Sequence, residues 1–198
     1  MNQGVRGHVL TGRVLDVGSR GTPSYVERMT RQEPLELQSV DLSFPEGSPG
    51  HVDLERDPLP HPDASFDQVL VFNLLEHVYE HGHVLREARR VLKDGGRLLG
   101  FVPFLQQYHP DPRDYFRYTR DALERMLADA GFADVRVEEV GRGPFAANFK
   151  NVMFAAPMPL RVALLYWYWA LDSLFLALRP DATRRYPLGY LFRARRRS

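Results

Sequence analysis

Short aliphatic runs and helix-patterned segments alternate along the first two thirds of the chain. Strands are expected where β-branched and aliphatic residues cluster between turn residues, at 13–17, 35–42, 50–53, 66–72, 97–102 and 135–140. Helices are expected at 23–29, 74–93 and 119–131. Strands that alternate with helices predict a mostly parallel α/β sheet that is doubly wound, with helices on both faces.

The two longer helical segments have recognisable ends. In the segment 74–93 the apolar positions 84, 85, 88, 91 and 92 share one face, and Gly95-Gly96 is expected to end the helix. Thr119 is a suitable N-cap for the next helix, and Gly131 is expected to close it.

The region after the sixth expected strand contains a long apolar run. Residues 162–178 form an apolar run of 17 residues that is broken only by Asp172 and Ser173. A membrane-spanning helix needs about 20 apolar residues, so this run is short and carries a charge near its middle. We expect a helical insertion, about 152–180, that covers the active site or forms an interface. Contact with a membrane surface is the rival interpretation.

Composition and charge exclude several classes of protein. The chain has 198 residues, enough for one domain with its own core, and it has no cysteine, which excludes disulfide scaffolds and cysteine nucleophiles. No apolar run follows a basic cluster at the N-terminus, so a cytoplasmic location is expected, with peripheral membrane contact as an addition. The net charge is +1, but residues 179–198 hold seven arginines against one aspartate. A charge concentrated in one tail does not indicate a nucleic-acid-binding face.

Acidic residues stand near the carboxyl ends of three expected strands, where ligands bind in such sheets. Asp16 precedes Gly18, and a glycine there lets the backbone turn sharply while Asp16 can accept hydrogen bonds from an ammonium group. Asp41 lies 25 residues later, where its carboxylate can accept both hydroxyls of a ribose. Asp53 follows the short third run. Taken singly, Asp16 with Gly18 is more typical of a tight turn, and Asp41 of a strand-end cap.

Two further sequence motifs combine with the acidic strand ends into one pattern. Leu75-Glu-His-Val78 begins the helix after the fourth strand, and Val91-Leu-Lys-Asp-Gly-Gly96 precedes the fifth. With the acidic strand ends, they resemble the class I S-adenosylmethionine-dependent methyltransferases, in particular the type 11 group, from about Arg13 to Val140. The resemblance implies a single domain, residues 1–198, with a seven-stranded Rossmann-like sheet. Residues 187–194 would supply its last, antiparallel strand.

The resemblance also implies S-adenosyl-L-methionine as cofactor and a set of residues to hold it. Asp16, Gly18, Ser19 and Gly21 would form the cofactor loop. The others are Asp41 with Leu42 for the ribose, Asp53 with Leu54 for the adenine, and Asn73 with Leu74 for the methionine end. The family usually has glycines two and four positions after the first, where this chain has Arg20 and Thr22.

The segment 103–119 is the expected wall of the acceptor site. It resembles a segment of related enzymes in which a histidine precedes an Asp-Tyr-Phe-Arg-Tyr-Thr run. His109 is the favoured general base, with Asp111 or Asp114 to orient it, because an oxygen or nitrogen acceptor needs a proton removed. His77 is the competing base.

Four residues of the same segment are expected to bind the acceptor: Asp114, Tyr115, Arg117 and Tyr118. A structural interpretation stands beside this one. Arg117 would then pair with a carboxylate and brace the loop, and the tyrosines would pack. No metal is expected, because His77, His81 and His83 lack a supporting carboxylate pattern and fit a solvated helix face.

These expectations combine into one function and one rival. The first is a methyltransferase that acts on a hydroxyl, with an amine as the alternative, of a small-molecule, glycan or lipid-linked acceptor. The rival is a catalytically silent module of the same fold that uses its apolar insertion to bind a partner or membrane. The four aromatic residues at 166–169 cannot all be hidden on one helix face, so we expect either a homodimer or membrane contact.

Overall fold

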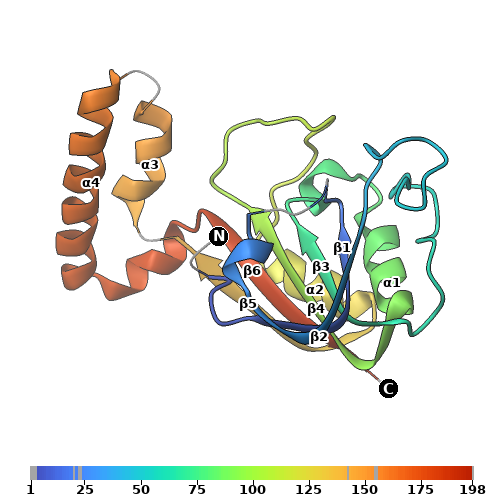
Figure 1. Ribbon diagram of the computed structural model, residues 1–198. Coiled ribbons are helices and arrows are strands. Elements are labelled where there is room, and N and C mark those ends of the chain that lie inside the picture. The colour runs from blue at the N-terminus through green and yellow to red at the C-terminus, as the bar shows by residue number, and fades with distance from the viewer. Residues whose placement is uncertain (1–3, 20, 22–23, 142, 154–155, 198) are drawn as a thin grey trace.

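The computed structural model describes residues 4–19, 21, 24–141, 143–153 and 156–197 (Figure 1). Arg20 and Thr22, where the sequence departs from the family pattern, lie outside these residues. The strands are β1 (Val9–Val17), β2 (Thr30–Val40), β3 (Phe66–Phe72), β4 (Leu92–Pro103), β5 (Phe132–Val140) and β6 (Gly189–Arg196). They form one sheet in the order β2-β1-β3-β4-β6-β5.

The direction of the strands confirms the expected topology. Strands β2, β1, β3 and β4 run parallel, and β6 runs antiparallel to both β4 and β5. Strand β6 is antiparallel, as the resemblance implied for residues 187–194, and it lies between β4 and β5.

The sheet has six strands in the described residues where seven were expected. The expected strand at 50–53 is reduced to one isolated bridge, in which His51 pairs in parallel with Asp41. The run is too short to extend the ladder, because proline and charged residues follow at once, from Asp57 to Pro62.

Helices α1 (His81–Val91) and α2 (Arg120–Asp129) pack on the same face of the sheet. They supply the buried side chains of Val84, Leu85, Leu123 and Leu127 to the larger core cluster. Thr119 caps α2 as expected, since its side chain accepts a hydrogen bond from the backbone N–H of Ala122.

The other face has a thinner cover. The expected helix at 23–29 is only one 3-10 turn, η1 (Val26–Arg28). Tyr25, Val26 and Met29 pack there with Val5 against the apolar side chains of the sheet. Short segments thus take the place of the helices that the doubly wound pattern predicted for this face.

Both ends of the helix expected at 74–93 were wrong. Residues Leu75–His77 form a separate 3-10 turn, η2, and helix α1 begins at His81. Helix α1 ends at Val91, and Leu92 is already extended and pairs with Phe66 of β3. Gly95, with φ +73°, lies in the irregularity that precedes the next pair of the register. The glycines therefore shape the start of β4 rather than stopping the helix.

The insertion between β5 and β6 is a helical hairpin. It consists of α3 (Pro144–Val152), α4 (Met158–Leu178) and the 3-10 turn η3 (Pro180–Arg185), so it begins before the expected residue 152. The hairpin projects away from the sheet, with α4 on its outer side (Figure 1). By length and composition, α4 is apolar enough to cross a membrane.

Candidate active site

The carboxyl ends of β1, β2 and β3 form one edge of the molecule. Val17 is paired with Val40 on one side and Val71 on the other, and the backbone N–H of Gly18 donates to Val40 at 2.8 Å. The residues that follow these strands, Gly18, Asp41 and Asn73, therefore lie along the same edge. The topology brings the expected cofactor residues together.

Asp16 lies inside this edge rather than on it. Its side chain is fully buried, and the hydroxyl of Tyr25 lies 2.8 Å from each carboxylate oxygen. Burial raises the pKa of Asp16 to about 7, against the opposing effect of the hydrogen bond from Tyr25. Tyr25 is held in place by stacking on Phe72, with ring centroids 4.2 Å apart. Direct contact of Asp16 with a ligand stays a prediction.

The loop after β1 is packed against the residue that follows β3. Gly18 has φ +80°, and a Cβ added to it would collide with the side chain of Leu74. Only glycine allows Leu74 to come this close. Ser19 is buried, and its hydroxyl donates to the carbonyl of Gly21 at 3.0 Å, which ties the turn to itself.

Asn73 explains why Leu74 reaches Gly18. Its φ is +49°, a left-handed conformation, and its backbone N–H donates to Phe101 at 2.9 Å. The turn directs Leu74 back toward the end of β1, while Asn73 itself is exposed. Both residues expected at the methionine end of the cofactor thus lie beside Gly18.

Asp41 and Asp53 are partly exposed carboxylates on neighbouring turns. Asp41 accepts a hydrogen bond from the backbone N–H of Ser43 at 2.7 Å, and Asp53 accepts one from Glu55 at 3.0 Å. The bridge between Asp41 and His51 places Asp53 two residues away from the same point. Leu42 is half-exposed and Leu54 is buried. The oxygens here suit a ligand that carries hydroxyl and amino groups.

The two expected bases are brought together by the loop between β4 and α2. The rings of His77 and His109 meet edge to face with centroids 5.1 Å apart. His77 Nδ1 lies 2.6 Å from the carbonyl of Arg113, and His109 Nδ1 lies 2.9 Å from that of Gln107. Because a carbonyl only accepts, Nδ1 carries the proton in the neutral ring of His77. His109 Nδ1 lies between the carbonyl of Gln107, which accepts, and the guanidinium of Arg117 at 3.2 Å, which donates.

Asp114, rather than Asp111, supports His109. One oxygen of its buried carboxylate accepts the backbone N–H of His109 at 2.9 Å and lies 3.5 Å from Nδ1 of the ring. Arg117 donates to both oxygens of Asp114, and this bond holds the pKa of Asp114 well below its usual range. Arg117 therefore pairs with a carboxylate and braces the loop, as the structural interpretation required.

The two tyrosines of the segment have different environments. Tyr118 is buried, and its hydroxyl donates to the carbonyl of Leu75 at 2.9 Å, so it fastens the loop to η2 (Leu75–His77). Tyr115 is partly exposed, and its hydroxyl accepts a hydrogen bond from Arg113 at 2.9 Å. Of the two, Tyr115 is the one that can still face an acceptor.

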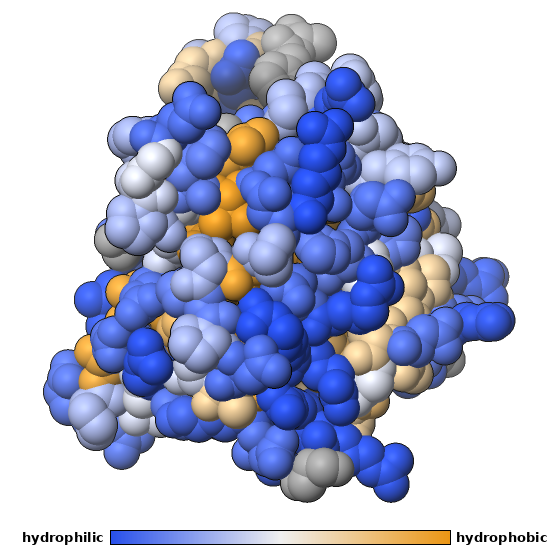
Figure 2. Space-filling model, turned by 90° about the vertical axis from the view of Figure 1, so that its right-hand side faces the viewer, coloured by the Kyte–Doolittle hydropathy of each residue, from blue (hydrophilic) through white to orange (hydrophobic). Residues whose placement is uncertain are grey.

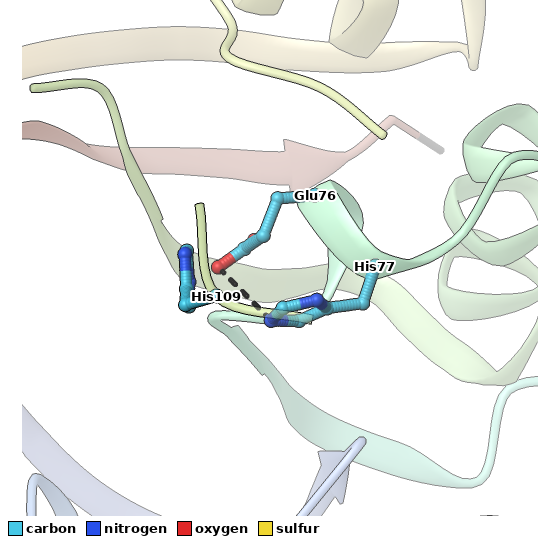
Figure 3. A group of neighbouring side chains, drawn as sticks. All are labelled: Glu76, His77 and His109. Carbon is cyan, nitrogen blue, oxygen red and sulfur yellow. Dashed lines mark ion pairs between the residues drawn. The ribbon is translucent and has the colours of Figure 1, made fainter. Parts of the chain in front are cut away.

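Glu76 is the residue that sequence reasoning missed. It was part of the Leu75–Val78 motif without a role, yet its carboxylate points from η2 toward the two histidines, with Oε1 3.8 Å from His77 Nε2 (Figure 3). Both oxygens are buried without a hydrogen-bond partner, and burial raises the pKa of Glu76 to about 8. The carboxyl is therefore mainly protonated at neutral pH.

The donors of Glu76, His77 and His109 lie within 4.8 Å of one another, close enough to be considered as metal ligands. The guanidinium of Arg117 lies 3.2 Å from His109 Nδ1, which opposes a second cation there. His81 and His83 do not join the group: His81 packs on Phe116, and His83 lies 3.0 Å from the carbonyl of Asp57. Acid–base chemistry suits this cluster better than metal binding.

Comparison with known proteins finds methyltransferases similar to part of the chain. A family model for a methyltransferase domain, type 11, matches residues 15–100, which run from the last three residues of β1 through β2 and β3 to most of β4. A probable S-adenosylmethionine-dependent methyltransferase of Mycobacterium tuberculosis is 35% identical over 92 residues, 43% of this chain and 34% of its own length. The 27-O-demethylrifamycin SV methyltransferase of Amycolatopsis mediterranei is 55% identical over 40 residues, 20% of this chain and 15% of its own. The chain thus spans about a third or less of these relatives.

Solved structures agree on the fold across the whole chain. A methyltransferase from Mesorhizobium loti superposes with a TM-score of 0.57 at 16% identity, covering 98% of this chain and 95% of its own. The [4+2]-cyclase SpnF gives a TM-score of 0.60 at 20% identity, covering 99% and 78%. Residues 15–100 are thus similar to a type 11 methyltransferase domain, and the fold of the whole chain is that of the solved methyltransferase structures. Because one neighbour is named as a cyclase, the fold alone does not assign the reaction.

Proposed function

We propose that this chain is an S-adenosylmethionine-dependent methyltransferase that methylates a hydroxyl group, with His109 as the general base. The observation that carries the proposal is the placing of His109 in a long loop beside the edge formed by β1 to β3. The loop fixes the backbone of His109 by a hydrogen bond to Asp114 and contacts the ring at Nδ1, so Nε2 is the ring nitrogen that can meet the acceptor. An unmodified amine would need less help with its proton than a hydroxyl, so a built base favours oxygen.

The residues at the strand edge fit the cofactor. Gly18 supplies a close backbone approach, and Asp41 and Asp53 supply oxygens for a ribose and an amino group. When bound, S-adenosylmethionine supplies a methyl group on a sulfonium centre. Leu74 and Asn73 would border its methionine end, because they are the residues that the turn after β3 directs toward Gly18.

The chain's own residues then handle the acceptor. His109 Nε2 takes the hydroxyl proton, while Nδ1–H stays bonded to Gln107. Asp114 stabilises the imidazolium that forms, since its buried carboxylate lies 3.5 Å from Nδ1. Arg117 keeps Asp114 ionised and in place. Alignment of the acceptor supplies the rest of the acceleration, for which good positioning gives roughly 7–11 kcal/mol.

A titration with S-adenosylhomocysteine, followed by a methylation assay on a panel of hydroxylated small molecules, glycans and lipid-linked glycans, tests the proposal. Binding of S-adenosylhomocysteine and transfer of labelled methyl to an oxygen support it. Transfer only to nitrogen would replace the hydroxyl by an amine. Failure to bind the cofactor in a folded protein would leave the catalytically silent module as the function.

A further inference from the structure

The outer face of α4 consists entirely of apolar and aromatic side chains and prolines. The residues with exposed side chains are Met158, Pro159, Leu160, Val162, Ala163, Leu165, Tyr166, Trp167, Trp169, Ala170, Leu174, Ala177 and Leu178. Trp167 is 62% exposed and Leu174 is 63% exposed, values unusual for residues of this kind in a packed protein. By contrast, the side of the molecule that carries α1 and the loops 41–65 is mainly hydrophilic (Figure 2).

The carboxylate near the middle of α4 is hydrogen-bonded within the hairpin. Asp172 is buried, and its two oxygens accept hydrogen bonds from the backbone N–H groups of Phe145 and Ala146 at 3.0 and 2.8 Å. These amides belong to the first turn of α3, where a carboxylate is favourable. A Cβ at Gly143 would collide with the carboxylate. The one acidic residue of α4 thus places no charge on the outer face.

The arrangement of the apolar surface favours lipid over a second copy of the chain. At 100° per residue, the exposed positions of α4 cover roughly 220° of the helix, while a helix partner covers only a narrow seam. A lipid surface can cover all of it at once. Arg179, Arg184 and Arg185 follow α4 directly and are exposed, as residues that meet anionic headgroups would be.

The hairpin leaves and re-enters the sheet at one point, because Val140 and Gly189 are paired neighbours of β5 and β6. If α4 crossed a bilayer, α3 would have to cross back. Helix α3 has nine residues, about 14 Å, against a hydrocarbon thickness of about 30 Å. Helix α3 is therefore too short to cross the bilayer, so α4 has to lie along one leaflet.

The tryptophans agree with that orientation. Trp167 and Trp169 are near the middle of α4, where a crossing helix would carry them to the centre of the bilayer. They are two residues apart, so their rings point about 200° apart, to opposite flanks of the helix. On a helix lying in the plane, both flanks meet the headgroup region that tryptophan prefers.

We propose that the α3–α4 hairpin docks the protein on an anionic lipid surface, with α4 in the plane of one leaflet and Arg179, Arg184 and Arg185 among the headgroups. The inference stands on the hairpin alone and does not require the methyltransferase reaction. It gives the chain a second, separate binding surface.

Intrinsic fluorescence tests the proposal directly, because Trp167 and Trp169 are the only tryptophans of the chain. The full chain is mixed with phosphatidylcholine vesicles that contain or lack phosphatidylglycerol, and with brominated phospholipids as quenchers. We expect a blue shift and quenching with the anionic vesicles that weaken as salt is added. Arg184→Gln and Arg185→Gln should each lower the partition constant about fivefold at low salt.

Val162→Glu and Leu174→Glu change two exposed positions, so the fold has no reason to fail, and each should lower the partition constant about tenfold or more. A matched control, Gln32→Glu with Ala128→Glu, adds the same two charges to exposed positions on β2 and α2 and should bind vesicles unchanged. S-adenosylhomocysteine titration of the same variants keeps this test separate from the proposed reaction. Absence of vesicle binding, or a stable dimer that buries both tryptophans, would overturn the proposal.

Discussion

His77 and His109 come from separate segments, yet their rings are in edge-to-face contact, and the Nδ1 atoms lie 2.6 and 2.9 Å from carbonyl oxygens of the same loop. The contact distinguishes the two rings. His77 is nearly enclosed and faces Glu76, whereas the side chain of His109 is 34% exposed and can reach an acceptor. The geometry therefore ranks His109 above His77 as the base.

His109→Ala should lower turnover about 100-fold to 10⁴-fold, the usual contribution of general base catalysis, and leave S-adenosylhomocysteine affinity unchanged. Steady-state kinetics and calorimetry on the same preparation measure both quantities. His77→Ala serves as the comparison, since it removes the ring contact but not the base. Equal loss in the two variants would mean that the pair acts as one unit.

Asp41→Ala should weaken S-adenosylhomocysteine binding by about 1.5–3 kcal/mol, the range for hydrogen bonds to a charged group. The fold should survive, because Asp41 follows the last residue of β2 and is only half-buried. Isothermal titration measures the change, and circular dichroism checks the fold. An unchanged dissociation constant in the folded variant would remove Asp41 from the ribose site.

The raised pKa of Glu76 predicts that the free energy of unfolding depends on pH. Its pKa is about 8 in the folded chain against an ordinary 4.5, so between these values the unfolded chain releases a proton that the folded chain keeps. Stability due to this group therefore falls as pH rises from 4.5 to 8, by about 1.4 kcal/mol per pKa unit. Glu76→Gln should gain stability over the wild type from pH 5 to pH 8 in urea unfolding.

Glu87 offers a control of opposite sign. Hydrogen bonds from Arg90 lower the pKa of Glu87, so its stabilising contribution is present above pH 4.5 and is lost as pH falls below that value. Glu87→Gln should be less stable than the wild type by a constant amount between pH 5 and pH 8. A Glu76→Gln variant that behaved in the same way would show that Glu76 is ionised in the folded chain.

Asp172→Ala should destabilise the hairpin by about 1–2 kcal/mol, because it leaves two N–H groups of α3 without their acceptor. Tryptophan fluorescence follows the unfolding of α4, while far-ultraviolet circular dichroism follows the whole chain. We expect the fluorescence transition to move to lower urea. If the two unfolding transitions coincide and neither moves to lower urea, the hydrogen bonds of Asp172 do not stabilise the start of α3.

The local pattern of apolar and polar residues predicted the elements whose burial depends only on their own sequence. The apolar run 66–72 is β3 with the same bounds, and Thr119 caps α2. The short run at 50–53 has the same local character, but it gains only one bridge with β2. Its outcome depends on a neighbouring strand, which periodicity does not contain.

The residues of the candidate site also include some that the local sequence predicts and some that it does not. Gly18 and Asp41 were found because strand ends of a parallel sheet must meet at one edge, whereas Asn73 was implied by the family resemblance. The protonated state of Glu76 depends on burial by a loop more than 30 residues away, since Tyr115 and Phe116 both donate backbone N–H groups to its carbonyl. Likewise, the partner of Asp172 is the start of a different helix. Such long-range contacts carry no signal in a single sequence.

The position of β6 has a consequence for the order of events during synthesis. Strand β5 is paired with β6 and is separated from β4 by it, and β6 is synthesised after the other strands described. The hairpin emerges earlier, while β5 has no ladder to join. A nascent chain therefore offers its apolar helices to the surroundings before its sheet is complete, so a lipid surface met at that moment would receive the hairpin first and the finished domain second.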